Sequence, residues 1–260
     1  MTEQFYRNLA ALKDTSKESN VALAETSATD LNGWIIRQLG VRPGESLLDI
    51  GSGTGKRTLS LARVTGETGY VLAIDRSFEN LSMLSQQSLD AGLEKRIRLL
   101  QINLDEFEGY LREEDFDRAL ASRALYHLKR PRAAFNAIHL ALKPGGILLF
   151  YGPGRQDHAE LKRFHAELCG ETSSVENREP TFIEGTGLQC VRDFFAHVEI
   201  VRFEQPLRFE TPDALHTCWR ISRLYDEALE QRFQQAAARH FAFHSVFETI
   251  QRVVGIRAVK

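Results

Sequence analysis

The chain has 260 residues, 43% of them hydrophobic and 26% charged, so it is long enough for one large globular domain with elaborations. Its 33 Lys and Arg residues nearly balance 35 Asp and Glu residues, and the net charge of −2 argues against the basic face typical of nucleic-acid-binding proteins. No apolar run approaches the ~20 residues of a membrane-spanning helix. The first residues lack the apolar core of a signal peptide, so we expect a cytoplasmic protein.

The three cysteines, Cys169, Cys190 and Cys218, are far apart in the sequence. Their odd number and wide spacing favour neither a disulfide framework nor a zinc site. We therefore expect no metal ion in this protein.

Two segments precede the first predicted strand. Residues 1–28 are polar, with a helical fragment that contains Tyr6. Apolar residues recur at helical spacing from Leu31 to Leu39, which predicts a helix there. Gly40 and the Pro43-Gly44 turn end this helix and lead into the strand.

The stretch 46–55, SLLDIGSGTG, is the most informative part of the sequence. Its apolar strand pattern carries Asp49 and ends in three glycines spaced two apart, and a helical pattern begins by Thr58. A glycine-rich turn allows the backbone to approach a ligand closely. The spacing differs from the dinucleotide fingerprint G-x-G-x-x-G and from the phosphate-binding P-loop, since Lys56 and Arg57 follow the last glycine.

A second buried strand pattern, Tyr70 to Ile74, ends at Asp75. An acid about 20 residues beyond such a turn can bind the two hydroxyls of a ribose. The alternative role for Asp75 is to cap the next helix, but Ser77 is better placed for that. A helix around 78–89 and a strand at 97–102 should follow, the strand running into Asn103 and Leu104.

A fourth strand is predicted at 116–122, ending in Ser122, and the segment Arg123-Ala-Leu-Tyr-His-Leu follows it. Pro131 suits the first turn of a helix over 133–142, because its missing N–H would lack a partner there in any case. The Lys-Pro-Gly-Gly turn at 143–146 then leads into a fifth strand at 147–151.

Together these features make residues 43–151 resemble the class I S-adenosylmethionine (SAM)-dependent methyltransferases, of the small-molecule type that includes the ubiquinone-biosynthesis group. The resemblance implies a Rossmann-like α/β fold, with a mostly parallel seven-stranded sheet, an antiparallel last strand and a helical cap. It implies SAM as cofactor and S-adenosylhomocysteine as product. The cofactor-binding residues that it implies are Asp49, Gly51, Ser52, Gly53, Gly55, Asp75, Arg76, Asn103, Leu104 and Ser122.

One of these residues departs from the family pattern. Family members usually carry an Asp at the position of Asn103, where it accepts a hydrogen bond from the adenine amino group. An Asn carbonyl can also accept this bond, and Asp105 is a possible substitute. Leu104 would pack against the adenine ring.

The pattern after Tyr151 is looser. We expect a helix at 158–168, a turn at 184–187, a strand at 198–203, helical segments from Thr211 to about Phe243 and a last strand over 250–259. The whole chain, 1–260, is predicted to be a single domain. Its core would comprise residues 30–151 and 190–260, and its cap residues 1–28, 152–190 and 205–245.

An alcohol, phenol or ammonium acceptor must lose a proton, and His is the usual base. His127 lies just past the fourth strand, but a His here also packs under the cofactor in many family members. His158 and Tyr126 are further candidates, each of which could instead line the pocket. Two arginines that follow neighbouring strands, Arg123 and Arg155, suggest an anionic acceptor, as guanidinium groups bind carboxylate or phosphate bidentately.

Four functions remain open. The first is methyl transfer to an oxygen or nitrogen atom of a small molecule, and Tyr6 would join the two arginines in contacting it. The second is methylation of RNA or protein, although the sequence shows no separate basic RNA-binding module. The third is a non-methylating SAM-using enzyme of the same fold, and the fourth a SAM-binding protein without catalysis. The oligomeric state is open.

Overall fold

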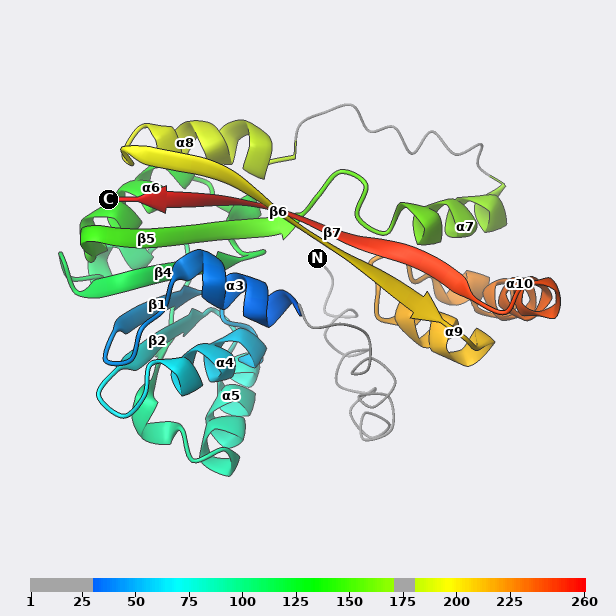
Figure 1. Ribbon diagram of the computed structural model, residues 1–260, viewed down its shortest axis with the longest axis horizontal. Helices are drawn as coiled ribbons and strands as arrows, with labels where there is room; N and C mark the ends of the chain where they lie inside the picture. Colours follow the sequence, from blue (N-terminus) through cyan, green and yellow to red (C-terminus); the bar gives the residue numbers. More distant parts are fainter. Residues whose placement is uncertain (1–29, 171–180) are drawn as a thin grey trace. The chain divides into compact units, whose positions relative to one another are not determined.

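The computed structural model describes residues 30–170 and 181–260, apart from the side chains of Glu108 and His127 (Figure 1). The chain divides into two compact units. The core unit contains Leu31–Arg155, residues 181–203 and Arg252–Lys260, and the second unit contains Asp30, residues 156–170 and Glu204–Gln251 among those described. Each unit is described by itself below. The predicted division into core and cap stays a prediction.

Seven strands form one mixed sheet in the order β3-β2-β1-β4-β5-β7-β6. Strands β1 to β5 pair in parallel, and β7 pairs antiparallel with β5. The predicted fold class is therefore confirmed. The strands are β1 (Ser46–Ile50), β2 (Tyr70–Asp75), β3 (Ile97–Gln101), β4 (Phe116–Ser122), β5 (Leu142–Pro153), β6 (His197–Phe209) and β7 (Phe247–Val259).

The strand order determines where a ligand can bind. The connection after β1 leads to β2 on one side, whereas β4 returns to the other side of β1. Because both neighbours of β1 are parallel to it, the loops after β1 and β4 diverge at the carboxyl edge of the sheet. Ligands of open α/β sheets bind at such a switch point.

Helices cover both faces of the sheet in the core unit. One face packs against α3 (Leu31–Leu39), α4 (Lys56–Val64) and α5 (Phe78–Asp90). The other packs against α6 (Pro131–Ala141) and α8 (Leu188–Arg192). Short helical turns complete the unit: η2 (Glu94–Arg96), η3 (Phe107–Tyr110), η4 (Leu125–His127) and η5 (Ile183–Gly187).

Side chains alternate between the two faces along each strand. In β5, Leu148 and Phe150 join the cluster beneath α6, whereas Leu149 and Tyr151 join the cluster beneath α3 and α4. The same alternation places Asp49 of β1 on the α4 side, next to Leu47. A carboxylate is thus buried in a layer that is otherwise apolar.

The second unit has its own apolar cluster. It contains α7 (Ala159–Cys169), α9 (Pro212–Arg220), η6 (Glu227–Leu229) and α10 (Glu230–Phe243). The side chain of Trp219 stacks on Phe233 with 4.2 Å between ring centroids. Thr211 caps α9 by accepting a hydrogen bond from the Ala214 N–H, so the predicted helix start is confirmed.

The predicted turn at 184–187 is only partly correct. Residues Ile183–Gly187 form a helical turn that leads into α8, and the chain kinks within it at Gly185, whose φ of −103° and ψ of −110° are not helical. Gly187 is required there for packing, since an added Cβ would lie 2.7 Å from the ring of Phe150. The two glycines were taken as turn signals, whereas the second allows a helix to approach the sheet closely.

Candidate functional site

The loop 51–55 connects β1 to α4 and is built from backbone that only glycine adopts readily. Gly51, Gly53 and Gly55 have φ angles of 71°, 56° and 90°, in the left-handed region. The N–H groups of Gly51 and Ser52 both donate to the carbonyl of Ile74, at 2.8 and 3.0 Å. The loop is therefore tied to the end of β2.

The three glycines differ in how much space surrounds them, and one of them borders a space that the protein does not fill. An added Cβ on Gly51 would lie 2.4 Å from the Cβ of Ala124, and one on Gly55 would lie 2.1 Å from Leu84. An added Cβ on Gly53 would meet no atom within 4 Å. Gly51 and Gly55 thus allow close packing of the protein, whereas Gly53 faces open space.

Asp75 ends β2 and is joined to the glycine loop. Its Oδ2 accepts a hydrogen bond of 2.8 Å from the Gly53 N–H, and its Oδ1 accepts one of 2.9 Å from the Ser77 N–H. Oδ1 also accepts a 3.4 Å bond from the Asn80 side-chain amide, so both of its lone pairs are used, whereas Oδ2 can accept one further bond. The cap of α5 is Ser77, whose hydroxyl accepts from the Asn80 N–H, which leaves Asp75 to orient the loop.

Asp49 is a buried acid with unused hydrogen-bonding capacity. Its side chain has no exposed surface, its Oδ2 accepts a 2.6 Å bond from the Thr58 hydroxyl, and its Oδ1 has no hydrogen-bond partner. Burial raises the pKa of this carboxyl group to about 6, against the lowering effects of Thr58 and Arg57. The hydroxyl of Ser52 is another buried group without a partner. Buried polar atoms without a partner call for an explanation, and a bound ligand that donates or accepts hydrogen bonds would provide one.

The loop after β3 carries Asn103 and Leu104. Asn103 is exposed, and its side-chain oxygen accepts a 3.2 Å bond from the Asp105 N–H. Leu104 is half-buried against the core cluster. The carboxylate of Asp105 accepts from the Lys129 N–H at 2.8 Å, so this suggested substitute for Asn103 is already engaged. Arg76 is exposed.

A polar network that the sequence did not suggest lies at the carboxyl ends of β4 and β5. Ser122 donates a hydrogen bond of 2.7 Å to the hydroxyl of Tyr151, and the Arg57 Nε donates to the same oxygen at 3.3 Å. Arg57 also donates through Nη1 to the side chain of Asn32 in α3. Tyr151 is 1% exposed and packs edge-on against Trp34.

The segment after β4 contains three of the predicted site residues. Arg123 is exposed, with φ of 54°, and its N–H donates to the Tyr151 carbonyl at 3.0 Å. The Tyr126 hydroxyl donates to the same carbonyl at 3.2 Å. Tyr126 is close to Gly152, where an added Cβ would lie 1.3 Å from the hydroxyl oxygen. His127 ends η4, but its side chain is outside the described part of the structure.

The other predicted substrate and catalytic residues have contacts of their own. Arg155 lies in the core unit and pairs with Glu184, with 3.5 Å between Nε and Oε2. His158 belongs to the second unit, where it precedes α7 with φ of 52° and lies 3.7 Å from Asp157. Tyr6 is outside the described residues.

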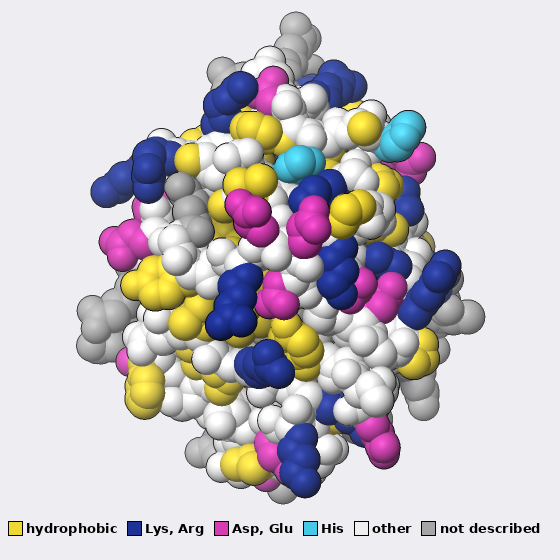
Figure 2. Space-filling view, turned by 90° about the vertical axis from the view of Figure 1, so that its left-hand side faces the viewer, with side chains coloured by type: hydrophobic (Ala, Val, Ile, Leu, Met, Phe, Trp, Pro, Cys, Tyr) yellow, Lys and Arg dark blue, Asp and Glu magenta, His cyan; other side chains and the backbone are white. Residues whose placement is uncertain are grey.

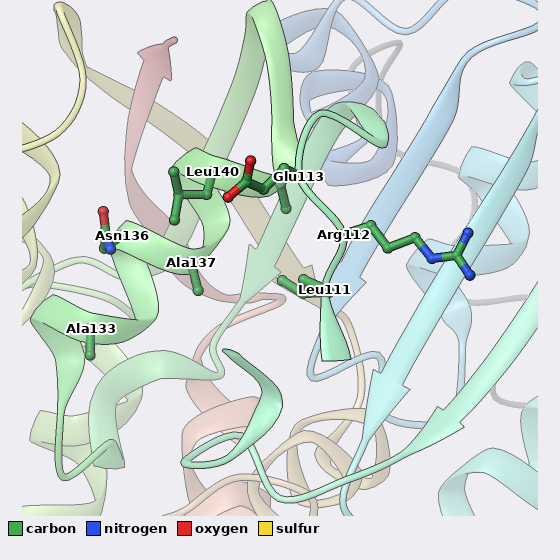
Figure 3. Close-up of a pocket in the computed structure, with 8 residues that line it drawn as sticks. Leu111, Arg112, Glu113, Ala133, Asn136, Ala137 and Leu140 are labelled. Carbon is green, nitrogen blue, oxygen red and sulfur yellow. The ribbon is translucent and has the colours of Figure 1, made fainter. Parts of the chain in front are cut away.

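A cavity of about 270 Å³ lies elsewhere in the core unit (Figure 3). Residues 111–113 line one side, and α6 contributes Ala133, Asn136, Ala137 and Leu140 to the other. Residues 111–113 precede β4, so they lie at the amino edge of the parallel strands, opposite the glycine loop. This cavity is therefore not part of the candidate site.

Two searches of the described residues bear on other functions. In residues 30–170 and 181–260, no cluster of three or more His, Cys, Asp or Glu side chains could hold a metal ion. Within the same ranges, every helix is too short or too polar to cross a bilayer.

Comparison with known proteins finds similarity over the glycine loop and the strands around it. Residues 48–150 match a family described as "Methyltransferase domain". Ubiquinone/menaquinone biosynthesis C-methyltransferases are similar to this chain: that of Vibrio vulnificus is 32% identical over 110 residues, 42% of each chain, and that of Azotobacter vinelandii 34% identical over 132 residues, 51% of each. The similar part therefore spans about half the length of these relatives or less.

Solved structures extend the similarity in fold over most of the chain. A methyltransferase of Bacillus halodurans, described as putative in its own report, aligns with 88% of this chain and 98% of its own, with a TM-score of 0.59 and 14% identity. At that identity the likeness concerns the fold. The chain thus has the Rossmann-like fold of the class I SAM-dependent methyltransferases, and its residues 48–150 match the methyltransferase-domain family.

Proposed function

We propose that the protein binds SAM at the glycine loop and transfers its methyl group to an oxygen or nitrogen atom of a small-molecule acceptor. SAM supplies a methyl group on a sulfonium cation, which a nucleophile attacks in line. The protein contributes position and exclusion of water, and effective molarity alone can supply ~7–11 kcal/mol.

The described residues fit such a cofactor. The Asp75 Oδ2 has a lone pair for a ribose hydroxyl beside its bond from Gly53, and Gly53 leaves space for the ligand to pass. Asp49 offers a buried anionic oxygen without a partner, which suits the ammonium group at the amino-acid end of SAM. Leu104 and Asn103 remain the proposed contacts of adenine, although Asn103 already accepts one bond from the backbone.

The observation that carries the proposal is the hydrogen bond between the Gly53 N–H and the Asp75 carboxylate. It joins the middle glycine of the loop to the acid at the end of the neighbouring strand at 2.8 Å. These two residues belong to the two separate motifs on which the cofactor assignment depends. Their contact supports one site built from both motifs.

A small molecule is favoured as acceptor over RNA by the charge distribution. On the face shown in Figure 2, Lys and Arg side chains are interspersed with Asp and Glu. Two of the cations at the amino edge are paired: Arg118 with Glu45 at 2.7 Å and Lys143 with Asp117 at 2.8 Å. Nucleic-acid-binding domains instead cluster unpaired cations on one face.

The charge of the methyl acceptor and the atom that receives the methyl group are also part of the proposal. An anionic acceptor would compete with Glu184 for Arg155, so Arg123 is the better candidate contact. The similar relatives are named C-methyltransferases, which makes carbon the main alternative to oxygen or nitrogen. The Tyr126 hydroxyl donates to a backbone carbonyl, a bond that suits a role in shaping the pocket.

The test is to incubate the purified protein with SAM labelled in its methyl group and a small-molecule extract of its source cells. Mass spectrometry should find the label in a small molecule, on oxygen or nitrogen. Label on carbon would correct the acceptor atom, and label in RNA or protein would overturn the acceptor class. SAM binding without any labelled product would instead favour a non-methylating enzyme or a binding protein.

A further inference from the structure

Arg57 is a half-buried arginine at the start of α4, two residues after Gly55. Two of its N–H groups are held by neutral acceptors: Nε donates to the Tyr151 hydroxyl and Nη1 to the Asn32 side chain. These partners come from β5 and α3. Three elements therefore fix the position and plane of one guanidinium group.

This guanidinium has no acidic partner in the described part of the chain, where no carboxylate oxygen lies within 4.0 Å of it. A guanidinium carries five N–H donors, so Nη2 and one N–H of Nη1 remain for another acceptor. A cation that is partly removed from water is expected to pair with an anion. The neutral partners orient Arg57 but form no ion pair with it.

Asp49 and Arg57 carry opposite charges on the two sides of the glycine loop in the sequence. Asp49 precedes the glycine loop with an unpartnered Oδ1, and Arg57 follows the loop. Arg57 acts on Asp49 through space, since it lowers the pKa of that carboxyl group. A ligand with an ammonium group and a carboxylate would complement both charges, and free amino-acid ends carry both groups.

We propose that Arg57 binds the α-carboxylate of the methionine part of SAM, and that Tyr151 and Asn32 hold it in position for this. This inference rests on the proposed function, because it assigns a residue to one end of the same cofactor. The remaining N–H groups of Arg57 donate to the carboxylate oxygens. The start of α4 adds to the attraction, because the N-terminal end of a helix carries partial positive charge.

The test compares two ligands that differ only in this carboxylate, SAM and decarboxylated SAM. Their affinities would be measured by calorimetry for the unaltered protein, Arg57→Gln and Lys56→Gln. Lys56→Gln is the matched control, because it removes the same charge from the neighbouring exposed side chain. The unaltered protein should prefer SAM by ~10- to 100-fold, the range expected for hydrogen bonds to a charged group.

Arg57→Gln should lose this preference, because its affinity for SAM falls while its affinity for decarboxylated SAM does not. Lys56→Gln should keep the preference. If Arg57→Gln weakens both ligands equally, Arg57 has only a structural role and the inference is wrong. Equal affinities of the unaltered protein for both ligands would also overturn it. Should the unaltered protein bind neither ligand, the proposed function fails first.

Arg57→Lys provides a second variant in case Arg57→Gln does not fold. A lysine keeps the charge but cannot hold the same fixed fork between Tyr151 and Asn32. The preference for SAM should fall between those of the unaltered protein and Arg57→Gln. A preference as large as in the unaltered protein would show that the fixed fork is irrelevant and would contradict the positioning role.

Discussion

Asp49→Asn should stabilise the ligand-free protein at neutral pH while weakening SAM binding. The ionised carboxylate of Asp49 is fully buried, and one of its oxygens has no partner. Burial raises the pKa of this group from 3.8 to about 6, so the native state resists its ionisation. Asn keeps the acceptor for the Thr58 hydroxyl but removes the buried charge.

The sign and size of the effect follow from linkage. Because the folded pKa lies above the unfolded one, the group's contribution to stability is fully present below pH 3.8 and is lost as pH rises through about 6. The shift of about two pKa units corresponds to ~3 kcal/mol at pH values above the folded pKa. Burying an unpaired amide N–H would cost ~1–3 kcal/mol, which leaves a net gain of ~0–2 kcal/mol for the variant.

The pH dependence is the more decisive quantity, since the amide cost is the same at every pH. Relative to the unaltered protein, Asp49→Asn should gain ~1.4 kcal/mol in free energy of unfolding between about pH 5 and about pH 8. Urea denaturation of both proteins at the two pH values measures this gain. Asp90→Asn, which removes an exposed carboxylate, is the control.

If the difference in stability between Asp49→Asn and the unaltered protein is the same at both pH values, burial of the Asp49 carboxylate does not destabilise the ligand-free protein and the argument is wrong. The same variant should bind SAM at least ~10-fold more weakly, because it lacks the negative charge that would face the ammonium group of the cofactor. Stabilisation together with weaker binding is the pattern expected when a residue is retained for function.

Three further predictions concern the loop and its surroundings. Asp75→Asn should weaken S-adenosylhomocysteine binding by ~10- to 100-fold in calorimetry, and unchanged affinity would remove the ribose assignment. Gly53→Val should abolish binding and cost ~1–2 kcal/mol from its left-handed backbone, while circular dichroism still shows a folded protein. Gly152→Ala should cost ~1–3 kcal/mol in urea denaturation by displacing Tyr126, whereas Gly109→Ala, with open space around it, should be nearly neutral.

The sequence predicted those parts of the site that are local in the chain. The glycine loop and the end of β2 each consist of a few consecutive residues whose apolar pattern and turn chemistry are visible directly. Ser77 was correctly identified as the cap of α5, which left Asp75 for the loop. The mostly parallel seven-stranded sheet with an antiparallel last strand followed from the resemblance to a known family and is confirmed.

The network around Arg57 could not be predicted in this way. Arg57 and Tyr151 are 94 residues apart, and their contact depends on the positions of α4 and β5 after folding. Tyr151 also reads as an ordinary strand residue, because a tyrosine ring suits a buried sheet position. The only sequence signal was an arginine immediately after a ligand-binding loop, where it was used only to exclude a P-loop.

Gly187 shows a second limit of reading the sequence alone. Glycine indicates a turn when only local backbone is considered, but this glycine lies within a helical segment that packs against Phe150. The cause is tertiary packing, which no local pattern reveals. The assigned roles of Asp49, Asp75 and the other site residues stay predictions until ligand binding is measured.

Calorimetry of S-adenosylhomocysteine binding to the unaltered protein, with Gly53→Val beside it, tests the central claim most directly. The account predicts saturable binding of one molecule per chain, competition by SAM, and no binding to a folded Gly53→Val variant. Absence of binding to the folded unaltered protein, or equal binding to the variant, would contradict the assignment of this loop as the cofactor site.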